Sequence, residues 1–269
     1  MSTNKKTINN AFVLIVGGIV LNAGVANAAP ASIETSTLDR DAGSTTNYGI
    51  GFTSSFAQRP FVGVDVQDAS LPYFSLRYKD FYVEGLNIGY NIWKNDKWLV
   101  DVLATPRFYE VEPAFADNNE LDGIDKTKRT YFAGVSGQYA SKHITYTLQL
   151  LTDVIESDGS EIVATGSKAF KLSNSFILTP TAGITYQDSK LVDHFYGVQP
   201  HEVAVGRPAY GGQDSTNFHV SLTGVWDTTK HIQLLGQLKY EVLGDGIGDS
   251  PIVDDTDIAT LAVGLVYRF

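Results

Sequence analysis

Apolar and polar residues alternate along most of the chain beyond residue 46, most clearly in the last thirteen residues, 257–269. Because successive side chains of a strand point to opposite faces, every second position there belongs to one apolar face. That face includes Leu261, Val263, Leu265, Tyr267 and Phe269. Such a strand, ending on an aromatic residue, is typical of the closing strand of an outer-membrane β-barrel, which we expect the barrel-assembly machinery to recognise. A strand of a soluble sandwich is the alternative.

The same alternation predicts an all-β, transmembrane antiparallel barrel of about ten strands. On most of these strands large apolar residues share one face and small or polar residues the other, as a barrel in lipid requires. An even count is typical of single-chain bacterial barrels, and twelve strands is the alternative count. We expect strands at 47–56, 71–92, 98–108, 129–140, 143–155, 161–171, 176–186, 218–226, 232–242 and 257–269.

The segment 71–92 is long enough for either one strand or a hairpin. A two-residue turn at Lys79 and Asp80 would pair Tyr78 with Phe81 and move the apolar residues of 86–92 to the inside. One continuous strand keeps the apolar face unbroken, and we expect this arrangement. It places Asp80 and Glu84 on the outer face, so the strand would have to protrude above the lipid.

Short and long connections alternate between the expected strands. Counting back from a periplasmic C-terminus puts every short turn, and the N-terminus, in the periplasm, and the long loops outside the cell. The longest loops are 110–128, 189–213 and 244–256. Aromatic residues gather near both ends of the strands, where membrane girdles lie.

The first 28 residues have the features of a secretory signal: Lys5 and Lys6, a short apolar core, and a small-residue cleavage site between Ala28 and Ala29. We expect residues 29–45 to be a flexible periplasmic segment and 46–269 to be the barrel, in the outer membrane of a Gram-negative bacterium. The chain has no cysteine, so no disulfide supports it.

The net charge is −10, and loss of Lys5 and Lys6 with the signal leaves −12. Nucleic-acid phosphates require a basic surface, so this balance argues against nucleic acid as a partner.

Enzymatic and metal chemistry have weak support in the sequence. Asp193 and His194 form the best acid–base pair among the five histidines, but no nucleophile or second carboxylate motif lies near them. The last loop is rich in acidic residues, which suits divalent cations, but the spacing is not that of an EF-hand. We therefore expect no catalytic residue, no cofactor and no metal site, with cation bridging to lipopolysaccharide as the minority reading of the acidic loop.

Charged residues at inward positions bear on whether the barrel conducts. Both signs are present, and a lumen of about ten strands is close to the size that side chains fill, so we expect a closed polar interior. A narrow solute path is the alternative. The inward charges are Arg77, Asp101, Arg107, Asp153, Lys239 and Glu241.

Four short motifs resemble the MltA-interacting protein / OmpV family of outer-membrane proteins. They are the segments 194–202 (HFYGVQPHE), 178–183 (LTPTAG), 249–253 (DSPIV) and 84–90, which contains Glu-Gly-Leu followed by Gly-Tyr. The resemblance covers nearly all of the chain after Tyr48. It implies an outer-membrane barrel without catalytic residues and, for the member that gives the family its name, a scaffold between a murein hydrolase and a murein synthase.

Two classes of function follow as hypotheses. The first is a scaffold or interaction protein, whose partners are outer-membrane lipid, lipopolysaccharide and periplasmic murein enzymes. The second is a small permeability barrel or a surface adhesin. Tight binding of murein enzymes without conductance would favour the first class, and openings that change when Asp101 or Arg107 is neutralised would favour the second.

Overall fold

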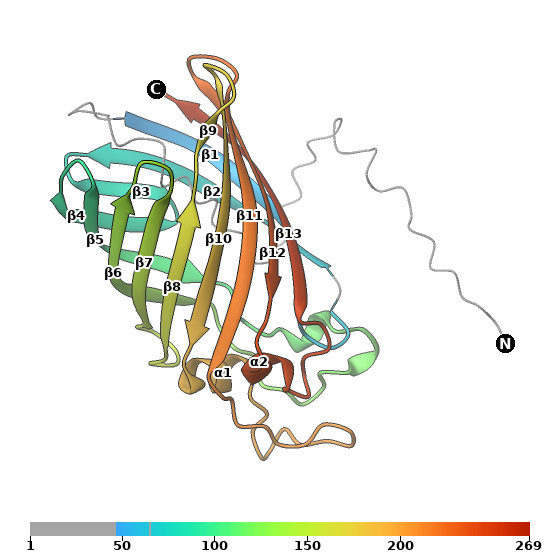
Figure 1. Ribbon diagram of the computed structural model, residues 1–269. Helices are drawn as coiled ribbons and strands as arrows, with labels where there is room; N and C mark the ends of the chain where they lie inside the picture. Colours follow the sequence, from blue (N-terminus) through green and yellow to red (C-terminus); the bar gives the residue numbers. More distant parts are fainter. Residues whose placement is uncertain (1–46, 65) are drawn as a thin grey trace.

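Alternating residues form long antiparallel strands throughout the computed structural model, which describes residues 47–64 and 66–269 (Figure 1). Two short helices and two 3₁₀ helices interrupt the connections: α1 (Ser189–Tyr196), α2 (Asp245–Gly248), η2 (Pro113–Phe115) and η3 (Asp117–Asn119). The strands are β1 (Asn47–Gln58), β2 (Val66–Tyr78), β3 (Phe81–Gly85), β4 (Asn87–Lys94), β5 (Trp98–Arg107), β6 (Thr130–Ala140), β7 (Thr145–Asp153), β8 (Ser160–Ser167), β9 (Phe170–Lys171), β10 (Phe176–Gln187), β11 (Ser215–Asp227), β12 (Ile232–Val242) and β13 (Asp257–Arg268).

These strands close into one barrel. Apart from β8 and β9, each pairs with its neighbours in sequence, and β13 pairs with β1 from Gly49 opposite Arg268 to Ala57 opposite Thr260. β8 and β9 both pair with β10 and together make one interrupted strand. The described residues therefore form a closed antiparallel barrel of twelve strands. The predicted all-β antiparallel barrel is confirmed, and its strand count is twelve, the alternative to the expected ten.

The prediction of one strand over 71–92 is wrong. The chain reverses at Lys79–Asp80, pairing Tyr78 with Phe81, and again at Gly85–Leu86, pairing Glu84 with Asn87. Lys79 and Gly85 have positive φ angles of 56° and 61°, which suit such tight turns. Each two-residue turn inverts the side-chain alternation, so two turns restore it, and the apolar face looked continuous.

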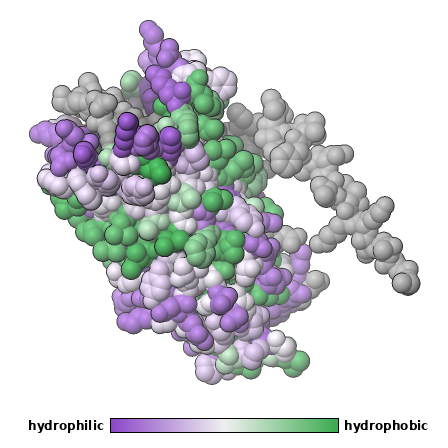
Figure 2. All heavy atoms as spheres, in the orientation of Figure 1, coloured by the Kyte–Doolittle hydropathy of each residue, from purple (hydrophilic) through white to green (hydrophobic). Residues whose placement is uncertain are grey.

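The outer face of the barrel is apolar and the inner face is polar. Large apolar side chains are exposed along every long strand, for example Phe52, Val102, Leu150 and Leu238. Figure 2 shows them as an apolar band between two hydrophilic ends. Because only lipid makes such a surface stable, the band marks the membrane-spanning zone. No helix within 47–64 and 66–269 combines the length and the apolar character that a membrane crossing needs.

The two ends of the barrel differ. One end carries the C-terminus and five connections of two to four residues between paired strands; the other carries the long loops, α1 and α2 (Figure 1). Short periplasmic turns and long extracellular loops are the rule for these barrels, and the first end is therefore periplasmic. The expected signal (1–28), its cleavage between Ala28 and Ala29, and the segment 29–45 lie outside the described residues.

Gly134 of β6 allows β7 to approach closely. A Cβ built there would lie 1.9 Å from the carbonyl oxygen of Leu150, whereas a Cβ at Gly137 of the same strand meets nothing within 4 Å. We expect Gly134→Ala to lower the free energy of unfolding by about 1–3 kcal/mol, the usual cost of overpacking. Gly137→Ala is the control and should change it by less than about 0.5 kcal/mol. Urea titration of the refolded barrel measures both, and equal effects would contradict the prediction.

Candidate functional site

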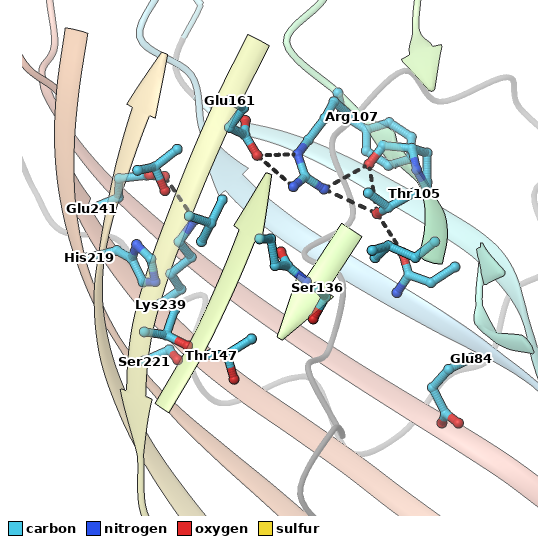
Figure 3. Close-up of a pocket in the computed structure, with 18 of the residues that line it drawn as sticks. Glu84, Thr105, Arg107, Ser136, Thr147, Glu161, His219, Ser221, Lys239 and Glu241 are labelled. Carbon is cyan, nitrogen blue, oxygen red and sulfur yellow. Dashed lines mark hydrogen bonds and ion pairs between the residues drawn. The ribbon is translucent and has the colours of Figure 1, made fainter. Parts of the chain in front are cut away.

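The barrel encloses a cavity of about 890 Å³. It extends from the periplasmic turn at Lys94–Asp96 to the underside of the extracellular loops, at Phe61 and Tyr196. Inward-facing residues of most strands line it, and Figure 3 shows ten of them labelled. This cavity is the candidate functional site, because it is the place where polar and charged groups converge inside the lipid-facing wall.

The strongest contacts in the cavity surround Glu161 on β8. The Arg107 guanidinium of β5 lies 2.6 Å from its Oε1 atom (Figure 3). The Tyr109 hydroxyl donates a 2.6 Å hydrogen bond to its Oε2 atom. Only 1% of the Glu161 side chain is exposed. Gln187 Nε2 also donates to Oε2, at 3.5 Å. The carboxylate is thus fully paired, and it ties β5 to β8 across the lumen just beneath the loops.

Smaller polar pairs line other parts of the wall. The Tyr82 hydroxyl donates to Asp101, and Thr105 Oγ1 donates to Asn87 Oδ1 at 2.6 Å. On the opposite side Lys239 Nζ lies 2.9 Å from Glu241 Oε2 (Figure 3). Both signs of charge are present, and two oppositely charged pairs, Arg107–Glu161 and Lys239–Glu241, lie in contact. The lumen is therefore polar and carries charges of both signs.

The long loops form a compact cap over the extracellular end. Buried apolar side chains from four loops pack in one cluster with Phe132 and Leu151 of the barrel wall. Polar contacts join the same loops: Arg59 donates to the carbonyl oxygens of Phe108 and Glu110, at 2.9 and 2.5 Å. The loop residues of this cap are Phe61, Val64, Val111, Leu121, Ile124, Leu191, Val192, Phe195, Tyr196, Val198, Ile247, Ile252 and Val253. A well-packed core at this position closes the extracellular mouth.

Burial also acts on the ionisable groups of the cap. Burial raises the pKa of the Tyr196 hydroxyl and of the Tyr109 hydroxyl. At Tyr109 the negative charge of the neighbouring Glu161 raises the pKa in addition. Burial lowers the pKa of the Arg59 guanidinium, against the opposing charge of Glu110. Both phenols therefore stay neutral through the physiological pH range, and the Tyr109 hydroxyl keeps the proton that it donates to Glu161.

The structure places most of the predicted inward charges along the cavity: Arg77, Asp101, Arg107, Lys239 and Glu241. Asp153 lies elsewhere, at the end of β7, where it accepts hydrogen bonds from Thr130 and from the backbone of the loop 155–157. Its role there is to cap a loop.

The prediction that Glu84 stands above the lipid on the outer face is wrong. Glu84 lines the cavity and accepts a hydrogen bond from the Tyr73 hydroxyl, because the turn at Lys79–Asp80 inverts the facing of β3. Glu161 and Tyr82 also line the cavity, although neither was predicted to face the lumen. For Tyr82 the sequence signal is the pair of tight turns on either side of β3. Glu161 begins a strand whose alternation is interrupted at 168–169, so its facing was not predictable.

The closing strand lies where its pattern predicted. Val263, Leu265 and Tyr267 are exposed on the lipid-facing side of β13, and the Phe269 backbone N–H donates to the Tyr48 carbonyl oxygen at 3.0 Å. Leu261 shares this face by its register opposite Phe56. Recognition of these residues by the assembly machinery stays a prediction.

The other predicted chemistry is dispersed. His194 lies 4.0 Å from Glu156, while the Asp193 carboxylate accepts the backbone N–H of Gly212, so the two neighbours do not act on one point. In the last loop Asp257 accepts from Tyr240 and Asp255 from the backbone of Asp257.

A different group, Asp125, His201 and Glu202, brings its ligand atoms within 4.8 Å of one another. The Glu202 carboxylate already accepts two backbone N–H groups, from Asp125 and Gln199. These contacts explain the group as a link between two loops.

Comparison with known proteins is consistent with this architecture. A family model described as MltA-interacting protein MipA matches residues 50–269. The outer membrane protein named YiaT from Escherichia coli O157:H7 is 25% identical over 221 residues, covering 82% of this chain and 90% of its own. MltA-interacting protein from Escherichia coli (strain K12) is 22% identical over 226 residues, with the same coverage. A solved outer membrane channel of the COG4313 group from Pseudomonas putida F1 covers 93% of this chain and 100% of its own at a TM-score of 0.44 and 8% identity.

Proposed function

This chain belongs to the family of MltA-interacting protein MipA, and we propose that it is a non-enzymatic scaffold that holds murein-processing enzymes at the outer membrane. The family resemblance predicted from its motifs is confirmed, as is its location in the outer membrane of a Gram-negative bacterium. The observation that carries the proposal is the contrast between the ends of the barrel. The extracellular end is closed by a packed cap. The periplasmic end, where murein enzymes work, presents an exposed charged rim.

That rim is basic although the chain as a whole has a net charge of −10. Every short periplasmic turn has an exposed lysine in it or beside it, against fewer acidic residues such as Asp80 and Asp96. A ring with such an excess of positive charge steers and orients a partner of opposite charge. The rim lysines are Lys79, Lys94, Lys97, Lys142, Lys171 and Lys230. We infer that the partner surface is acidic, and the name of the relative MltA-interacting protein supports a murein enzyme as that partner.

Neutralising the rim should weaken the scaffold. We expect a chain with Lys79→Gln, Lys97→Gln, Lys142→Gln and Lys230→Gln to retain roughly a tenth of the murein hydrolase activity that the unaltered barrel captures from solubilised membranes, because rim charges act mainly on encounter and are screened by salt. Digestion of purified murein by the captured material is the readout.

The control neutralises three extracellular lysines, Lys126, Lys128 and Lys190, one fewer than the rim variant, and should capture as much as the unaltered chain. Equal losses in both variants would show a nonspecific charge effect. The scaffold proposal is abandoned if the unaltered barrel captures no murein enzyme while it opens steadily in planar bilayers. That second result would favour a small permeability barrel, for which the polar lumen is the supporting observation.

A further inference from the structure

Strand pairing in the barrel wall stops short beside the hairpin of β3 and β4. The pairing of β3 with β2 ends at Gly85 opposite Phe74, and the pairing of β4 with β5 ends at Ile88 opposite Ala104. Beyond this short hairpin, on its extracellular side, residues 66–73 of β2 pair only with β1 and residues 105–107 of β5 pair only with β6. We call the space between these two free edges, above the turn at 85–86, the notch. The contacts of Arg59 with the 108–110 backbone bound it on the extracellular side.

Prolines mark both free edges. Pro72 lies on β2 and Pro106 on β5, each two residues beyond the last pair with the hairpin. Proline has no N–H to donate, so within sheets it is confined to positions that lack a partner strand on one side. The third proline within the described strands, Pro180 of β10, follows the same rule, because it lies opposite the break between β8 and β9. The prolines thus indicate that the sequence itself favours unpaired edges on β2 and β5 at this level.

Side chains satisfy polar groups at the β5 edge. Arg107 Nη1 donates to the Pro106 carbonyl oxygen at 3.3 Å and to Thr105 Oγ1 at 3.1 Å, and Thr105 donates to Asn87 of the hairpin. In hydrocarbon an unsatisfied backbone group costs several kcal/mol, and an irregular edge survives only where protein or an internal cavity satisfies it. These contacts let the notch persist at membrane depth.

The notch connects the outer surface with the lumen. Pro106 has the same facing as Val102, which is 40% exposed on the lipid side, and it pairs with the exposed Tyr131. Pro106 and Phe108 nevertheless line the internal cavity. A residue of the outer face can do so at this level only where the wall is open.

Behind the notch, apolar side chains lie beside the polar group of Thr105, Arg107 and Glu161. Leu103 lies on the inner face of β5, next to the edge, and packs against the cap cluster. On the outside, by contrast, β2 presents Asp68 and Ser70 beside the notch, both exposed. The apolar residues that line this end of the cavity with Leu103 are Phe61, Tyr109, Tyr196, Leu243 and Ile258.

From this arrangement we propose that the notch is a lateral entry for a membrane amphiphile. Its acyl chain passes between β2 and β5 and lies against Leu103 and the underside of the cap, while its polar end stays beside Asp68 and Ser70. The route begins in the membrane, which favours an amphiphile over a water-soluble solute, and Arg107 and Thr105 at the edge can contact polar groups close to its head. The proposal goes beyond a scaffold role and does not depend on it.

Tryptophan quenching by brominated acyl chains tests the route, since bromine quenches only on close approach. The three native tryptophans, Trp93, Trp98 and Trp226, are replaced by phenylalanine, and single reporters are placed on β5. Leu103→Trp reports from the lumen behind the notch. Val102→Trp reports from the lipid-facing side, and Leu99→Trp from the lumen where β4 completes the wall. The refolded chains are measured in vesicles of brominated and unbrominated phosphatidylcholine.

We expect the Leu103→Trp reporter to be quenched at least half as strongly as the Val102→Trp reporter, and the Leu99→Trp reporter to be nearly unquenched. Equal protection at 99 and 103 would overturn the proposal. Should Leu103→Trp fail to fold, Leu243→Trp reports from the same apolar end of the cavity, and its protection would overturn the proposal equally. Lengthening the hairpin by two residues on each side of 85–86 should abolish the quenching at 103, because β3 and β4 then fill the notch.

Discussion

A barrel whose extracellular cap is loosened is expected to conduct steadily in a planar bilayer, whereas the unaltered barrel is expected to be silent. The change is Leu191→Asp together with Phe195→Asp on α1, two side chains that are each 1% exposed in the cap cluster. Burying two unpaired carboxylates is costly enough to drive α1 out of the cap. The polar lumen then opens at both ends, and steady single-channel openings should replace the silence of the unaltered barrel, as twelve strands enclose more space than side chains fill.

The control places a carboxylate on the exposed side of the same helix, with Lys190→Asp, and should leave the barrel silent. Adding Asp101→Asn to the loosened barrel should change its ion selectivity, because Asp101 lines the path. Silence of the loosened barrel would place the seal elsewhere, for example at the apolar cluster of Tyr73, Val225, Leu235, Ala262 and Val266 inside the lumen. Steady openings of the unaltered barrel would mean that the cap is no seal, and would favour the permeability function.

Side-chain alternation predicted most of the wall because each lipid-facing strand must keep one apolar face. The strand 232–242 was predicted with the bounds that the structure has, and the closing strand with one residue more. At 71–92, side-chain alternation led to a wrong prediction for a physical reason. Each two-residue turn inverts the facing, so two of them cancel, and the outward apolar positions of β2 and β4 keep one parity as a single strand would. The short strand β3 between them is inverted, and its Tyr82 and Glu84 face the lumen.

The candidate site was predictable where it follows strand parity and hidden where it depends on folding of the loops. Asp101 and Lys239 were located in the lumen by alternation alone. The cap could not be found this way, because residues such as Phe61, Leu121 and Ile247 have no periodic spacing and meet only when four distant loops pack together. The notch was hidden for a similar reason, although Pro72 and Pro106 within strands were a readable sign of unpaired edges.

Removal of the Glu161 carboxylate should destabilise the barrel more than any change on its surface. Glu161→Leu leaves the Arg107 guanidinium, 18% exposed, without its partner, and leaves the Tyr109 hydroxyl without its acceptor. Breaking one side of a buried ion pair costs about 3–5 kcal/mol, and the partial exposure of Arg107 favours the lower end of that range. Urea unfolding of the refolded barrel, followed by tryptophan fluorescence and by its gel mobility, measures the change.

Two further variants separate the cost of an unpaired charge from the loss of a contact. Arg107→Met together with Glu161→Leu should recover most of the lost stability, because an apolar pair of similar volume leaves no buried charge behind. Lys126→Met breaks the ion pair of Lys126 with Glu112, and because the Lys126 side chain is 57% exposed it should cost less than about 1 kcal/mol. If the double variant were as unstable as Glu161→Leu alone, the pair would contribute through its specific geometry, as the link between β5 and β8 that supports the cap.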